Sequence, residues 1–300
     1  MSLEDTLASW AKGPGTTEQT KCDNAERVIR EALQADSFLK TLNPAPRVFV
    51  QGSYKANTNV RADSDVDVCV VLPETYFWNI QFSDITVEQV PGTKPPICFT
   101  DFKNAVETAL VNRFGRSGVA RGDKAFDVHA NTYRIDADVV AAFEHRRYLK
   151  RRLDGVVPYE LGIEFRTDGG SQIINWPDQT YDNGVAKNNR NGRAYKRAIR
   201  IAKRLRNQMQ EENIAAAQDI GSFLIESLVW NVPDEGFGYD NYADVIRHVL
   251  AHTFNGTMND SGCQEWGEVN ERKYIFKGAP SVREKAHRFL SAAWDYLDFK

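Results

Sequence analysis

The chain has 300 residues and carries 38 Lys and Arg against 41 Asp and Glu, which gives a formal net charge of −3. Hydrophobic residues make up 42% and charged residues 26% of the sequence, a composition typical of folded globular proteins and unlike that of disordered chains. No apolar run is long enough to cross a bilayer, so we expect no membrane partner. The opening stretch MSLEDTLASW lacks the basic and apolar regions of a signal peptide, which predicts a cytoplasmic protein with reduced cysteines.

The first half of the chain alternates between helical and strand patterns. Apolar residues recur at helical spacing over residues 16–40 and 101–115, and each pattern predicts an amphipathic helix. Short apolar runs predict strands over residues 47–51, 65–72 and 133–140. Helices placed between strands in this order favour a mixed α/β lobe with a central sheet.

Turn residues become frequent after about residue 165, where Gly169-Gly170, Trp176-Pro177 and Asn183-Gly184 predict a loop-rich stretch. Helical patterns then dominate, first from Asn191 and later near residues 219–230, 240–254 and 280–298. We therefore expect two domains, a mixed α/β lobe over residues 1–165 and a helical lobe over residues 166–300.

The most informative stretch joins the first predicted strand to the second. The first strand stops at Gly52-Ser53, and an Asp-x-Asp formed by Asp65 and Asp67 opens the next. Side chains two residues apart in a strand share a face, so the two carboxylates are presented together. Neighbouring carboxylates repel unless a cation joins them, and Mg²⁺ prefers one or two carboxylates plus substrate phosphates. Gly52 lets a phosphate approach the backbone closely, and the Ser53 hydroxyl can bind its oxygens.

A later strand supplies a third carboxylate, from Asp136 or Asp138. A carboxylate inside an otherwise apolar strand is costly to bury without a partner. Three carboxylates from two neighbouring strands can hold two Mg²⁺ ions, with Mn²⁺ as the alternative metal, and such a pair assists an in-line displacement of pyrophosphate. An acidic pair alone is weak evidence, because such pairs at strand starts are often only solvated.

These residues carry a family resemblance. GSYKANTNVRADSDVDVCVVL resembles the signature of the DNA polymerase β-like nucleotidyltransferases, a Gly-Ser, a spacer and an Asp-x-Asp. Together with RIDADVV and KNNRNGRAYKRAIRIAKRLRN, it is most similar to the bacterial CD-NTases, relatives of cyclic GMP–AMP synthase and oligoadenylate synthase. The resemblance runs over about residues 20–230. It implies an α+β fold in which a nucleotidyltransferase lobe with a mixed central sheet is followed by a helical nucleotide-binding lobe.

The resemblance also implies roles for individual residues. Asp65 and Asp67 match the first two catalytic metal ligands of the family, and Asp138 matches the third, with Asp136 kept as the alternative. The Gly-Ser turn described above matches the phosphate-binding turn.

A strongly basic segment lies between Lys187 and Met209, where no acidic residue occurs. A solvated helix face normally mixes charges of both signs, whereas like charges one turn apart repel. We favour a stripe that faces a polyanion over a simple solvated face. The basic residues of the segment are Lys187, Arg190, Arg193, Lys196, Arg197, Arg200, Lys203, Arg204 and Arg206.

By the same resemblance, Lys203 and Ser222 match residues that bind the donor triphosphate, and Phe223 matches an aromatic residue that stacks on a nucleobase. For Ser222 the alternative is plain capping of a helix, and for Phe223 it is burial in the core. The second basic cluster, His145 to Arg152, is expected to be a solvated loop or strand edge. His248 and His252 share a helix face, but no further metal ligand stands nearby.

The resemblance implies an enzyme that joins nucleoside triphosphates into a cyclic di- or trinucleotide messenger for anti-phage signalling. The alternatives are transfer of nucleotides to an RNA end or another acceptor, and an inactive scaffold that binds nucleotides or RNA. The near-neutral total charge argues against a nucleic-acid partner. Regulatory or effector proteins of a defence operon are the expected protein partners. Base choice, ring size and linkage are not fixed by the sequence.

Overall fold

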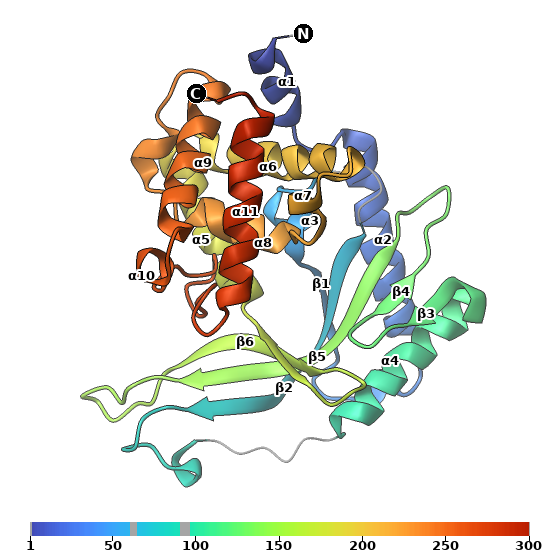
Figure 1. Ribbon diagram of the computed structural model, residues 1–300. Coiled ribbons are helices and arrows are strands. Elements are labelled where there is room, and N and C mark those ends of the chain that lie inside the picture. The colour runs from blue at the N-terminus through green and yellow to red at the C-terminus, as the bar shows by residue number, and fades with distance from the viewer. Residues whose placement is uncertain (1, 61–64, 91–96, 300) are drawn as a thin grey trace. The chain divides into compact units, whose positions relative to one another are not determined.

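The computed structural model describes residues 2–60, 65–90 and 97–299, and its chain folds into two compact units (Figure 1). The sheet unit consists of Gly15–Lys55 and Ala62–Pro177. The helical unit consists of Met1–Pro14, Ala56–Arg61 and Asp178–Lys300. The predicted helical lobe begins at residue 166, whereas this division falls after Pro177 and also assigns two earlier segments to the helical unit.

The described part of the sheet unit contains a mixed sheet of seven strands. Strand β2 (Val66–Ile80) lies parallel to β5 (Ala137–Tyr148) along most of its length. All other pairs are antiparallel, in the order β1-β2-β5-β4-β3, and β6 and β7 extend the sheet from β5. The shorter strands are β1 (Arg47–Val50), β3 (Val119–Arg121), β4 (Phe126–Val128), β6 (Tyr159–Arg166) and β7 (Gln172–Asn175).

Helices α2 (Thr16–Ala35) and α4 (Phe99–Phe114) provide the main core of this unit. Their apolar faces bury Ile29 and Leu110 in one cluster with Val68, Val139 and Phe143 of the two central strands. The helical and strand patterns of the first half are thus confirmed, and burial of these side chains fixes β2 and β5 in the middle of the sheet.

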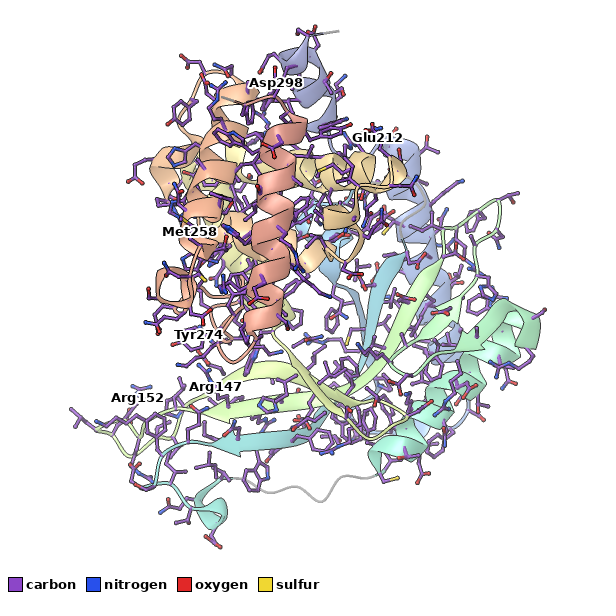
Figure 2. All side chains as sticks on the ribbon, in the orientation of Figure 1. Arg147, Arg152, Glu212, Met258, Tyr274 and Asp298 are labelled. Carbon is purple, nitrogen blue, oxygen red and sulfur yellow. The ribbon has the colours of Figure 1, made fainter. Side chains whose placement is uncertain are left out.

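Strand β5 starts and ends later than predicted. It continues to Tyr148, so the basic cluster that we expected in solvent begins inside the sheet. His145 is only 2% exposed, and its Nδ1 lies 2.8 Å from Glu164 Oε2 on β6. Figure 2 labels Arg147 on the sheet unit. Its guanidinium lies 5.5 Å from the centre of the Trp176 ring. The expectation was wrong for this part of the cluster because β6 and Trp176 supply partners that a local pattern does not reveal.

The helical unit is built from helices of different lengths, and residues 264–279 form a long connection before the last of them. Within the described ranges, no helix has the length and the hydropathy needed to span a membrane. The bounds of the helices are α1 (Leu3–Trp10), α5 (Pro177–Arg190), α6 (Ala194–Glu211), α7 (Ala215–Gln218), α8 (Ser222–Trp230), α9 (Tyr242–Thr257), α10 (Asp260–Cys263) and α11 (Pro280–Tyr296). A short helix, α3 (Gly52–Ala56), follows β1.

The predicted loop at Asn183-Gly184 is instead part of helix α5. The Asn183 amide donates a hydrogen bond of 2.9 Å to the Val269 carbonyl. One turn later Lys187 is buried, with its ammonium 2.7 Å from the Val232 carbonyl. These tertiary contacts outweigh the weak helix propensity of an Asn-Gly pair.

Close packing at Gly162 on β6 gives a test of this sheet. A Cβ there would lie 2.8 Å from both the Asn175 carbonyl oxygen and the Trp176 ring. We expect Gly162→Ala to lower the free energy of unfolding by about 1–3 kcal/mol, as overpacking does. Gly169→Ala is the control, because its Cβ would meet no atom nearer than 3.6 Å. Urea unfolding measures both, and equal midpoints for the two variants would contradict this packing.

Candidate active site

Three adjacent strands bring carboxylates side by side. Asp67 on β2 is the register partner of Asp138 on the parallel strand β5. Asp127 on β4 is the register partner of Asp138 across the antiparallel pair. Residues directly opposite each other on neighbouring strands point to the same face of a sheet. Asp65 immediately precedes β2, so the strand pairing gathers four carboxyl groups at one edge of the sheet unit.

Asp127 is the member that the sequence reasoning missed. It lies in the three-residue strand Phe126–Val128, between two buried apolar residues. The apolar-acidic-apolar pattern of Phe-Asp-Val was the available signal. A strand of three residues is too short to stand out by periodicity, and only the pairing with β5 reveals its place.

The electrostatics of the cluster follow from this crowding. Burial raises the pKa of Asp138 to about 7, with further contributions from a side-chain hydrogen bond with Asp127 and the negative charges of Asp65, Asp67 and Asp127. Burial also raises the pKa of Asp65, and Asp136 and Asp127 add to the effect. Like charges held in one place disfavour ionisation of each other.

Asp136 occupies a different position from Asp138. It lies just before β5, and its Oδ1 accepts a hydrogen bond of 2.6 Å from the Ala130 backbone N–H. Its own carbonyl accepts from the Val66 N–H at 2.9 Å. The carboxylate of Asp136 therefore binds the backbone of the loop that precedes β5, whereas Asp138 lies in register with Asp67.

The donor set fits a hard divalent cation. Carboxylate oxygens are the ligands that Mg²⁺ prefers, and their mutual repulsion is relieved when a cation joins them. Across the described residues, no three His, Cys, Asp or Glu side chains converge closely enough to form a metal cage on their own. Mg²⁺ needs only one or two carboxylates when substrate phosphates complete its shell.

Gly52 lies directly against one of these carboxylates. A Cβ at this position would be 2.1 Å from Asp67 Oδ2, and Gly52 has a φ of +65°, a left-handed conformation that favours glycine. The neighbouring Ser53 is partly buried in the first turn of α3. The backbone N–H groups of this turn and the Asp67 carboxylate therefore lie close together.

Lys203 on α6 is buried in the helical unit, with a side chain only 1% exposed. Its ammonium forms an ion pair with Glu226 and lies 3.1 Å from the Thr58 carbonyl oxygen. The Thr58 hydroxyl donates to the same Glu226 carboxylate at 2.7 Å. The lysine is thus held by Glu226 and Thr58.

Ser222 and Phe223 both lie at the start of α8. Gly221 is the N-cap residue, and Ser222 makes no capping bond; its hydroxyl accepts a hydrogen bond of 2.9 Å from Arg206. The capping alternative for Ser222 is therefore wrong. Phe223 is 48% exposed, so the alternative of a core residue is wrong as well.

Part of the predicted basic stripe faces inward. Lys187, Arg200 and Arg206 are buried, and each donates to backbone carbonyls of the helical unit. The prediction that these three face a polyanion is wrong. Helix α6 lies within the core of its unit, where buried cations require acceptors.

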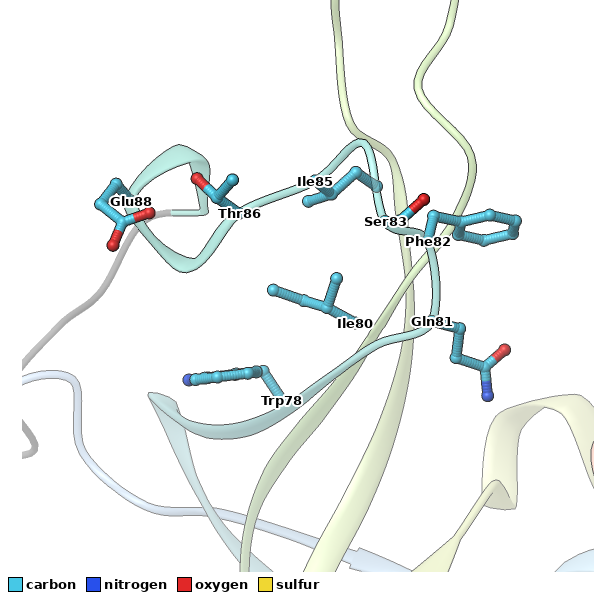
Figure 3. A pocket seen from close by; sticks show the side chains of 8 residues that line it. All are labelled: Trp78, Ile80, Gln81, Phe82, Ser83, Ile85, Thr86 and Glu88. Carbon is cyan, nitrogen blue, oxygen red and sulfur yellow. The ribbon is translucent and has the colours of Figure 1, made fainter.

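Two other features do not involve these carboxylates. His252 stacks between His248 and Trp266, at ring distances of 6.3 and 5.8 Å. An open cavity of about 560 Å³ lies beside the C-terminal end of β2, the end that is remote from Asp67 (Figure 3). Its lining residues are Trp78, Ile80, Gln81, Phe82, Ser83, Ile85, Thr86 and Glu88.

The contact between Gly52 and Asp67 predicts a specific loss. Gly52→Ala would push the Asp67 carboxylate aside and strain the turn, so we expect Mn²⁺ affinity to fall by about tenfold or more. Isothermal titration calorimetry of Mn²⁺ binding measures the change. Ser53→Ala is the control, since it leaves this contact in place. Unaltered Mn²⁺ affinity in a folded Gly52→Ala protein would argue against the arrangement.

The raised pKa of Asp138 predicts a pH dependence of stability. The folded protein binds this proton more tightly than the unfolded chain, so its metal-free stability falls as the pH rises from about 4 through about 7. Mg²⁺ should recover stability above this window, because it binds the ionised form. Thermal melts across this range, with and without Mg²⁺, test the effect. Asp138→Asn should flatten the dependence, and an unchanged slope in that variant would assign it to other groups.

Two protein families match parts of the chain. Residues 34–108 match a nucleotidyltransferase domain, and residues 182–298 match the cGAS/DncV-like nucleotidyltransferase C-terminal helical domain. The first match covers β1, α3 and the two carboxylates at the start of β2. The second match covers α6, α8, α9 and α11.

Relatives that match the chain over nearly their whole length support this similarity. The chain is 41% identical to the cyclic dipyrimidine nucleotide synthase CdnE of Legionella pneumophila, over 98% of this chain and 97% of that protein. It is 38% identical to the synthase of the same name from Cecembia lonarensis, over 99% and 98% of the two chains. The solved structure of the Rhodothermus marinus CdnE c-UMP-AMP synthase with Apcpp and Upnpp superposes with a TM-score of 0.84, at 31% identity over 99% of this chain and 97% of that one.

The similarity to these relatives extends over nearly the whole chain. The predicted α+β fold with a mixed sheet and a helical part is confirmed. The chain therefore belongs to the bacterial CD-NTases and is a nucleotidyltransferase of the cyclic oligonucleotide synthase type.

Proposed function

We propose that this synthase uses two Mg²⁺ ions, with Mn²⁺ as an alternative, to join two nucleoside triphosphates into a cyclic dinucleotide. The observation that carries the proposal is the register of β2 and β5, which pairs Asp67 with Asp138 while Gly52 adjoins the Asp67 carboxylate. This arrangement concentrates negative charge next to a turn of backbone N–H groups. Such a place suits a cation and a triphosphate together.

The three carboxylates have two tasks in this proposal. Asp65 and Asp67 would hold the metal ion of the donor triphosphate, and Asp138 would complete a second metal site for the attacking ribose hydroxyl. The hydroxyl oxygen attacks the α-phosphorus, the bond to the bridging oxygen breaks, and pyrophosphate leaves while Asp138 helps to remove the hydroxyl proton. Bound Mg²⁺ would neutralise charge that develops on the phosphates. Catalysis is then mainly positioning and electrostatic stabilisation.

The nucleotide-binding residues that we propose are those that the family resemblance implies. Gly52 and Ser53 bind phosphate oxygens through the turn. Lys203 and Ser222 bind the donor triphosphate, and Phe223 stacks on a base. The exposure of Phe223 and the position of Ser222 at the first residue of α8 support these roles. For Lys203, a phosphate would compete with Glu226 for the ammonium.

The identity of the bases is proposed from the relatives. The two relatives described above from Legionella and Cecembia are both named cyclic dipyrimidine nucleotide synthases. We infer that this chain prefers pyrimidine triphosphates and makes a cyclic dinucleotide. Anti-phage signalling, a cytoplasmic location and regulatory or effector partners remain predictions from the family resemblance.

One assay tests the reaction and its carboxylates. Purified protein is incubated with Mg²⁺ and each labelled triphosphate, alone and mixed, and then treated with phosphatase. We expect phosphatase-resistant small products from UTP and CTP without added RNA. Asp65→Asn and Asp67→Asn should lower their yield by about 10³-fold or more, because metal and donor are then misplaced.

The controls separate the alternatives. Glu212→Gln in the helical unit, whose carboxylate lies 2.7 Å from the Tyr296 hydroxyl, should leave the yield unchanged. Products that form only with an RNA primer would support transfer to an RNA end instead. Normal nucleotide binding without turnover would support an inactive scaffold.

A further inference from the structure

Residues 57–60, the joining segment, lie in the sequence between the Gly-Ser turn and the Asp-x-Asp, and they belong to the helical unit. Residues 57–60 follow α3, which begins at Gly52, and they precede Asp65 by only a few positions. Thr58 and Asn59 are buried, and Asn57 adopts a left-handed conformation with a φ of 54°. Because a buried backbone carbonyl requires a hydrogen-bond donor, the partners of this segment determine its position.

Side chains of α6 supply those donors. Arg200 Nη1 donates to the Asn57 carbonyl at 2.7 Å, Lys203 Nζ to the Thr58 carbonyl at 3.1 Å and Arg204 Nε to the Val60 carbonyl at 3.4 Å. Three cations within two turns of one helix thus bind the same short stretch of backbone.

The two arginines also bind a second element. Arg200 Nε donates to the Ala11 carbonyl at 2.8 Å, and Arg204 Nη1 donates to the Ser9 carbonyl at 2.7 Å. Both acceptors lie at the C-terminal end of α1, where helix carbonyls lack partners within the helix and favour a cation. Each guanidinium therefore bridges the end of α1 and the joining segment.

This double attachment depends on the shape of the guanidinium group. Its N–H donors point in fixed, different directions, so one arginine can satisfy two separated carbonyls. A lysine has the same charge, but its single nitrogen cannot reach two acceptors in this way. Arg200 and Arg204 are one turn apart, so they share a helix face.

We propose that Arg200 and Arg204 are positioning residues for the nucleotidyl transfer, which they serve by fixing residues 57–60 rather than by binding phosphate. The proposal rests on the proposed function, because the fixed segment directly follows α3, whose first residues form the Gly-Ser turn. Freedom in residues 57–60 would therefore reach this turn. A misplacement of about 1 Å in a reacting group can cost about a hundredfold in rate.

Charge-conserving variants test the proposal in the full-length protein. Arg200→Lys and Arg204→Lys are each compared with the wild type. We expect about tenfold faster amide hydrogen exchange over residues 57–60 and a fall in kcat of about 10–100-fold, with KM for the triphosphates within about threefold. Arg288→Lys is the matched control, because Arg288 is an exposed arginine on α11 of the same unit, and it should change neither measurement.

The outcomes are distinct. Lysine variants that retain wild-type exchange and kcat would overturn the proposal. A rise in KM at unchanged kcat and exchange would also overturn it, because the arginines would then bind substrate directly. Should the wild type make no product, the proposed function fails, and the exchange measurement still decides whether the arginines fix the segment.

Discussion

Repulsion between carboxylates on neighbouring strands is the constraint on which the site depends. Parallel pairing of β2 and β5 sets Asp67 beside Asp138, and the antiparallel pairing of β4 adds Asp127 on the other side. The sheet tolerates this crowding because the strands are held by apolar side chains such as Val68, Val139 and Phe143. The hydrophobic core thus supplies the free energy that keeps like charges together, and the same crowding makes the place receptive to a cation.

The helical unit solves a different electrostatic problem. Its central helix α6 carries many cations and no acidic residue before its last turn, yet it lies inside the core of the unit. Backbone carbonyls accept hydrogen bonds from several of these cations, among them the carbonyls of Ala11, Asn57 and Ile220. Lys203 also forms an ion pair with the carboxylate of Glu226. The positively charged side chains of α6 therefore hold backbone segments in place, in addition to any substrate that they bind.

The sequence was sufficient for the parts that depend on local pattern. The long helices, the start of β2 and the Asp-x-Asp follow from periodicity and from residue types that suit metal and phosphate. What it could not provide depends on pairing between distant segments. Asp127 joins the carboxylate cluster only because β4 pairs with β5. His145 is buried against Glu164 on the neighbouring strand β6. The inward orientation of Arg200 depends on carbonyls 143 and 189 residues away in the sequence. The roles of Lys203, Ser222 and Phe223 came from resemblance alone.

Recognition of the joining segment through its main chain has a consequence for sequence divergence. A carbonyl group is present whatever side chain a residue carries, so Asn57 and Val60 can be replaced without removing the acceptors that the arginines use. The arginines have no such freedom, because their function is in the side chain. Tolerance to substitution is therefore expected to be unequal across this contact, higher at positions such as Val60 of the segment that is held and lower at the two arginines that hold it.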